Sequence, residues 1–82
     1  MRLDLYLSRV GLVKRRTVAK QLCDNGLVKI NGVRSKPSRE IDVGDIIGIG
    51  GNRPITAEVT AIPGGNVKKE DRDKYYKPVS VG

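Results

Sequence analysis

The spacing of the apolar residues changes at Leu27, and this change constrains the fold more than any other feature of the chain. Before Leu27, apolar residues recur every three or four positions in two runs, Leu3, Leu7 and Val10, then Ala19, Leu22 and Cys23. From Leu27 onwards apolar and polar residues alternate, which is typical of strands. The sequence therefore predicts two helices followed by strands, an α+β fold.

The second helical run begins at a cluster of cations, Lys14-Arg15-Arg16. Gly11 separates it from the first run, and Gly26 suits the left-handed position that follows a helix. Neither Arg15 nor Arg16 can accept a hydrogen bond from the first amides, and cations at this end oppose the helix dipole. Because folding alone would not select these cations, they indicate a binding partner.

The alternating pattern in the second half of the chain predicts a small, mostly antiparallel sheet. Leu27–Arg34 reads as a tight hairpin with a type I′ turn at Asn31-Gly32. Further strands are predicted at residues 46–49 and 55–62. Two N-terminal helices are expected to pack on this sheet.

We expect one domain over residues 1–63 and a short C-terminal tail over residues 64–82. Within the tail, Lys68–Tyr76 could form a short helix, and its mixture of charges predicts a solvated face. Tyr75 and Tyr76 are expected to pack the tail onto the domain, with stacking on nucleic-acid bases as the alternative.

The positive charge lies almost entirely in the first half of the chain. Residues 1–39 hold ten Lys and Arg against two acids, a net charge of +8, whereas residues 40–82 carry −1. A concentrated basic segment of this kind predicts a nucleic-acid partner, because neutralising phosphates releases counterions and gives affinity for any sequence. A basic solvated surface without a partner is the alternative.

The composition argues against catalysis, metal binding and membrane insertion. The chain has no His, which removes the usual general base, and only one Cys, so a zinc site would need two or more carboxylates. We therefore expect no catalytic residues, no metal and no cofactor. No apolar stretch approaches the roughly 18 residues of a membrane span, so we expect a cytoplasmic protein with no membrane segment.

Five motifs occur in one order over residues 1–49. They are Arg2-Leu3-Asp4-x-x-Leu7, Arg16-x-x-Ala19-x-x-Leu22, Gly26-x-Val28-x-Ile30-Asn31-Gly32, Lys36-Pro37-Ser38 and Val43-Gly44-Asp45. Together they resemble the alpha-L RNA-binding motif, the type named after small-subunit ribosomal protein S-four. The resemblance implies an RNA-facing surface built from two helices and a hairpin.

Single-domain members of this family provide a second resemblance. The opening Arg2-Leu3-Asp4, the run Lys14–Lys20 and the tail Lys68-Lys69-Glu70 resemble the ribosome quality-control factors of the RqcP and heat shock protein fifteen group. The resemblance implies binding to rRNA and peptidyl-tRNA on a stalled large ribosomal subunit. It also implies support for C-terminal tailing of the nascent chain, with a tailing factor as a further partner.

The candidate RNA-binding residues are the cations and one hydroxyl of the expected RNA-facing surface. They are Arg2, Arg9, Lys14, Arg15, Arg16 and Lys20 from the helical side, and Arg34, Lys36 and Ser38 from the loop after the hairpin. Arginine forks match phosphate oxygens in pairs, and lysines act as point charges. Asp4 is expected to favour the helix dipole or to pair with a basic neighbour.

Three other functions remain open. The first is a general rRNA-binding or ribosome-assembly factor, and the second is the recognition domain of an RNA-modifying enzyme. The recognition domain is disfavoured, because residues 64–82 leave no room for a catalytic domain unless the chain is a fragment. The near-neutral, Ile-rich second half could also dock a protein.

Overall fold

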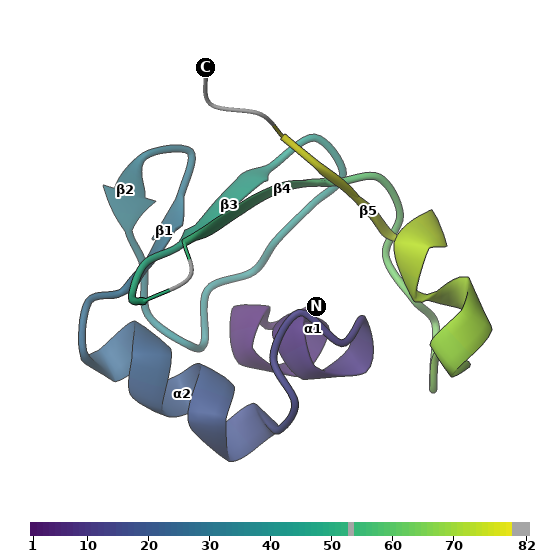
Figure 1. The fold of residues 1–82 in the computed structure, drawn as a ribbon, viewed down its shortest axis with the longest axis horizontal. Helices are drawn as coiled ribbons and strands as arrows, with labels where there is room; N and C mark the ends of the chain where they lie inside the picture. Colours follow the sequence, from purple (N-terminus) through teal and green to yellow (C-terminus); the bar gives the residue numbers. More distant parts are fainter. Residues whose placement is uncertain (53, 80–82) are drawn as a thin grey trace.

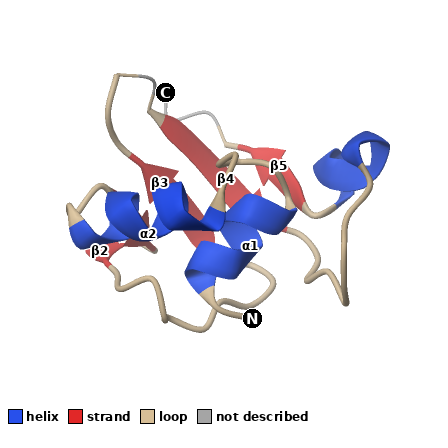
Figure 2. Ribbon diagram, turned by 90° about the horizontal axis from the view of Figure 1, so that it is seen from below, coloured by secondary structure: helices blue, strands red, loops and turns tan. Residues whose placement is uncertain are grey.

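The α-helices lie on one face of a five-stranded antiparallel sheet, so the fold has two layers (Figure 1). The structure is a computed structural model and describes residues 1–52 and 54–79. Its elements are α1 (Leu3–Arg9), α2 (Arg16–Asp24), β1 (Val28–Ile30), β2 (Val33–Arg34), β3 (Ile46–Ile49), β4 (Ile55–Val59), the 3₁₀-helix η1 (Lys69–Lys74) and β5 (Tyr76–Pro78). The strand order is β2-β1-β3-β4-β5. The predicted α+β architecture is confirmed, and Figure 2 shows α1 and α2 against the sheet.

The predicted hairpin turn is present between β1 and β2. Asn31 and Gly32 have φ angles of 53° and 81°, and a type I′ turn requires positive φ at both of these positions. The Asn31 side chain also accepts a hydrogen bond from the Ile46 amide at 2.9 Å and donates one to Asp45 at 3.1 Å. These two bonds tie the turn to the start of β3.

The hydrophobic core fills the space between the two helices and the inner face of the sheet. Its buried members include Leu3, Tyr6, Leu7 and Val10 from α1, Ala19 and Cys23 from α2, and Val28, Ile30, Ile47 and Val59 from the sheet. Tyr6 is a member that the predicted apolar stripe did not include. Its hydroxyl donates a hydrogen bond of 2.6 Å to the carbonyl of Tyr75, so its polar atom is satisfied inside the protein.

The segment predicted as a tail contributes an edge strand to the sheet. After η1, β5 pairs antiparallel with β4, with Tyr76 opposite Val59. Tyr75 and Tyr76 pack against the core, which confirms their expected packing role. Residues 80–82 of the expected tail lie outside the described residues.

The strand predicted at residues 55–62 is shorter in the structure, where β4 ends at Val59. The amides of Thr60 and Ala61 both donate to the carbonyl of Tyr75, at 3.0 and 3.3 Å. Regular pairing with β5 therefore ends after Val59, because the carbonyl of Tyr75 accepts hydrogen bonds from two successive amides.

Candidate RNA-binding surface

A buried carboxylate holds two of the candidate arginines in place. Asp4 is 2% exposed, and its oxygens lie 3.2 Å from Nε of Arg2 and 3.3 Å from Nε of Arg16. One of them also accepts a 2.8 Å hydrogen bond from the Leu5 amide. Nη2 of Arg2 also donates to Asp4, at 3.4 Å. The side chains of Arg2 and Arg16 remain 45% and 49% exposed, so the other N–H groups of each guanidinium can meet an anion from solvent. We call Arg2 and Arg16 the arginine pair.

The loop that contains Lys36 and Ser38 lies against the start of α1. The carbonyls of Arg39 and Pro37 accept hydrogen bonds from the amides of Leu3 and Asp4, at 2.8 and 3.1 Å. These bonds satisfy the first amides of α1, which would otherwise lack partners. They also bring the backbone of the loop that carries the exposed residues Lys36, Ser38 and Arg39 to the start of α1. Lys36 itself lines a pocket with Asp24 and Arg34.

The start of α2 carries the predicted excess of cations without a cap. Arg15 occupies the N-cap position and makes no side-chain capping bond, and the first turn contains no acid. The side chains of Lys14, Arg15 and Lys20 are exposed. Arg16 and Lys20 are one turn apart on the same helix face. The first amides and these cations together form an environment that favours an anion.

Arg34 sits at the other end of α2, where it supports the fold. Its Nη2 donates to the carbonyl of Asp24 at 3.4 Å, at the helix end where a cation is favourable. Its side chain also covers Gly26, where a Cβ would lie only 2.6 Å from Nε and Cζ of Arg34, and the φ of +74° at Gly26 separately favours glycine. The nine residues of α2 separate Arg34 from Arg16 by about 12 Å along the helix axis.

Arg9 lies on a different flank of α1 from Asp4. At 3.6 residues per turn, the five positions between them correspond to a rotation of about 140°. Tyr6 and Arg9 are i,i+3 neighbours, so Arg9 belongs to the flank on which Tyr6 reaches Tyr75. The structure thus brings Arg2 and Arg16 together at Asp4, places Arg34 beside Lys36 at the other end of α2, and places Arg9 on a different flank of α1.

Comparisons with known proteins identify relatives of this chain. The model of the S4 domain family matches residues 1–47. A protein of Streptococcus pneumoniae named "RQC P-site tRNA stabilizing factor" is 40% identical over 81 residues, covering 98% of this chain and 91% of the relative. A protein of the same name from Helicobacter pylori is also 40% identical, covering 95% of each chain.

The chain belongs to the family of RQC P-site tRNA stabilizing factors. The structure of Vibrio cholerae heat shock protein 15 also superimposes on this family member, with a TM-score of 0.89 and 26% identity. That match covers 98% of this chain and 82% of the other. The predicted resemblance is confirmed, and the matched region includes the C-terminal segment that forms η1 and β5.

The described residues contain no cluster of three or more His, Cys, Asp or Glu side chains that could hold a metal ion. Burial, with the nearby charges of Asp4 and Asp24, raises the pKa of the Cys23 thiol to about 11, so the thiol stays protonated and unreactive near neutral pH. In residues 1–52 and 54–79, no helix is long and apolar enough to cross a bilayer.

Sequence reasoning missed three cations of this family member. Arg39 follows directly on the run that contains Lys36 and Ser38, and its position in that run could have indicated it. Lys69 and Arg72 belong to the segment whose mixture of charges predicts a solvated face. Their spacing of three residues becomes informative only once the segment is known to be a 3₁₀-helix.

Proposed function

We propose that this protein is a non-catalytic RNA-binding factor of ribosome quality control. In this role it binds rRNA and P-site tRNA on large ribosomal subunits that hold a stalled nascent chain. The observation that carries the proposal is the arginine pair, held half-exposed by the buried carboxylate of Asp4. The name of the relatives supports the choice of P-site tRNA as the ligand.

The geometry suits folded RNA better than a base sequence. Folded RNA is recognised mainly through its shape, its phosphates and its 2′-hydroxyl groups. An arginine whose Nε is fixed by a carboxylate can direct its remaining N–H groups to phosphate oxygens without a further loss of side-chain freedom. The arginine pair is therefore a preorganised phosphate-binding site.

We extend the proposal to the tailing of the nascent chain. A tRNA that is held in the P site would keep the stalled peptide in place while residues are added to its C-terminus. In this account the protein supports C-terminal tailing in the cytoplasm, and a tailing factor joins it on the same subunit. The protein's contribution is binding alone, which agrees with the protonated state of Cys23 and the absence of His from the chain.

A sedimentation experiment tests the proposal. We expect tagged protein to be recovered with free large subunits that carry peptidyl-tRNA, and much less with small subunits or translating ribosomes. Release of the peptide with puromycin should lower the recovery. Equal recovery with and without puromycin would support general rRNA binding instead, and recovery with small subunits alone would contradict the proposed role.

Two variants make the experiment specific. Arg16→Ala removes one member of the arginine pair and should abolish most of the recovery. Lys29→Ala removes the same charge from an exposed position of β1, whose neighbours Val28 and Ile30 point into the core. Since Lys29 faces away from the helices, this control should be recovered like the unmodified protein.

A further inference from the structure

Arg72 packs directly on Gly11, although 61 positions separate them in the sequence. A Cβ at Gly11 would lie 2.6, 2.7 and 2.8 Å from Cδ, Nε and Cζ of Arg72, and Gly11 has a φ of +77°. Glycine therefore allows the arginine to lie flat against the end of α1. The Nε of Arg72 is buried there and has no hydrogen-bond partner among the described residues.

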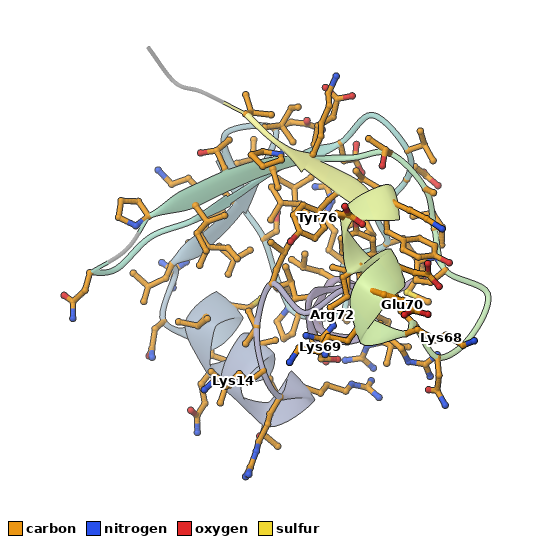
Figure 3. The ribbon with its side chains drawn as sticks, turned by 45° about the vertical axis from the view of Figure 1, so that its right-hand side comes forward. Lys14, Lys68, Lys69, Glu70, Arg72 and Tyr76 are labelled. Carbon is orange, nitrogen blue, oxygen red and sulfur yellow. The ribbon has the colours of Figure 1, made fainter. Side chains whose placement is uncertain are left out.

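The charges of η1 are sorted by face. A 3₁₀-helix has three residues per turn, so side chains three positions apart are aligned. Lys69 and Arg72 therefore share one edge, and Glu70 and Asp73 share another. Figure 3 shows Lys69 and Arg72 on the side of η1 that faces the α-helices, with Glu70 on the other side.

The third edge of η1 is neutralised internally. Asp71 and Lys74 form an ion pair of 2.9 Å. Among residues 1–52 and 54–79, in contrast, no ion pair within 4.0 Å includes Arg9, Lys69 or Arg72. The sequence of η1 reads as a mixture of charges, but in space it presents one unneutralised basic edge to the end of α1.

Arg9 adds to this basic edge from α1. It lies on the flank where Tyr6 bonds to Tyr75, and Tyr75 directly follows η1. Arg9, Lys69 and Arg72 together form what we call the flank patch.

We propose that the flank patch is a second phosphate-binding site, which contacts an RNA segment different from the one bound by the arginine pair. The proposal rests on the proposed function and extends it. Arg9, the last residue of α1, is about 7.5 Å from Asp4 along the helix axis and is rotated by about 140° from it. The two sites therefore face different directions.

Two sites of this kind let the protein bridge two RNA segments that lie close together, such as rRNA and a bound tRNA. Once the first site is occupied, the second binds at a high effective concentration. The affinity for a complex that presents both segments should therefore greatly exceed the affinity for either segment alone. This bridging distinguishes the proposal from a single basic surface.

The test compares two RNA ligands, a short RNA hairpin and purified large subunits that carry P-site tRNA. The variant K69Q/R72Q removes two charges and keeps the Cβ, Cγ and Cδ atoms of both side chains, so position 72 still covers part of Gly11. We expect it to bind the subunit complex about tenfold more weakly and the hairpin less than twofold more weakly. The control K74Q removes a charge that Asp71 already pairs, and should bind both ligands like the unmodified protein.

The outcomes separate this proposal from the proposed function. If K69Q/R72Q binds the subunit complex normally while Arg16→Ala does not, the flank patch is not an RNA site but the proposed function stands. If the unmodified protein does not bind the subunit complex, both are overturned. If K69Q/R72Q is lost from subunits only in a cell lysate, the patch faces a protein, which contradicts the proposal. Thermal unfolding of each variant shows that the fold is retained.

Discussion

The Oδ2 atom of Asp4, in the first turn of α1, lies 3.3 Å from the Nε of Arg16, the first residue of α2. The same carboxylate holds Arg2, so one buried residue both joins the two helices and orients the two arginines. The packing of the helices and the geometry of the candidate RNA site are therefore linked through Asp4. A change at Asp4 should affect both, whereas a change at an arginine should affect mainly binding.

Arg16→Ala is expected to weaken RNA binding by at least tenfold and to change the free energy of unfolding by less than about 1 kcal/mol. The Arg16 side chain is 49% exposed, so its ion pair contributes little to stability. Alanine also forms helices well and removes a cation that opposes the dipole. Filter binding and urea denaturation measure the two effects. Unfolding of the variant at ambient temperature would show that Arg16 is a structural residue.

Binding to structured RNA is expected to depend strongly on salt. About five phosphate contacts would give a slope near −4 in a plot of log K against log salt concentration. The measurement is a titration of a fluorescent RNA hairpin between about 50 and 200 mM salt. An affinity that stays constant over this range would remove the electrostatic account of binding.

Gly11→Ala is expected to destabilise the protein by roughly 1–2 kcal/mol more than the strain of alanine at a positive φ alone, because the new methyl group meets Arg72. Gly32→Ala is the matched control. Gly32 has a similar φ of +81°, but no atom lies within 4 Å of the position of its Cβ. Urea denaturation should show a greater loss for Gly11→Ala, and Arg72→Ala should restore part of it. Equal losses at the two glycines would contradict the observed packing of Arg72.

The thiol of Cys23 should react slowly with alkylating agents until the pH approaches 11, because burial raises its pKa to about 11 from the ordinary value of 9.0. The raised pKa means that folding favours the protonated thiol. Its contribution to stability is therefore complete below pH 9 and decreases as the pH rises from about 9 to 11. Mass spectrometry after alkylation measures the reaction, and Cys23→Ala should reduce the loss of stability over this range. Rapid labelling at pH 7.5 would contradict the burial of the thiol.

Local signals in the sequence predicted much of the fold. The helical spacing located α1 and α2, and Asn31-Gly32 predicted the turn, because each of these features is determined by neighbouring residues. β5 was not predicted, since its residues Tyr76–Pro78 are few and include a proline. The strand forms because it pairs with the edge of β4, a contact between distant parts of the chain that the local sequence does not reveal.

The candidate site could be predicted only in part, for the same reason. The excess of cations at the start of α2 was visible, because capping rules make it unfavourable for folding. The bond between Asp4 and Arg16 was not, since it links side chains 12 positions apart through helix packing. The contact between Arg72 and Gly11 joins residues 61 positions apart, so it too could not be predicted. Charge and resemblance thus indicate the function, whereas only the tertiary structure shows how the candidate site is built.

The central claim is that an arginine pair held by Asp4 binds RNA, and Asp4→Asn tests it most directly. The substitution raises the net charge from +7 to +8, so charge alone predicts tighter binding. It also removes the carboxylate that holds both arginines, at a cost in stability of roughly 1–2 kcal/mol, since the arginines are half exposed. Glu40→Gln is the control, because it makes the same charge change at an exposed acid that pairs only with the N-terminal amine among the described residues.

The decisive measurement is the affinity of both variants for purified large subunits that carry P-site tRNA, at a temperature where circular dichroism shows each to be folded. The account predicts that Asp4→Asn binds about tenfold more weakly than the unmodified protein, and that Glu40→Gln binds equally or slightly more tightly. Equal or tighter binding by Asp4→Asn would contradict the claim that the held arginine pair is the RNA-binding site.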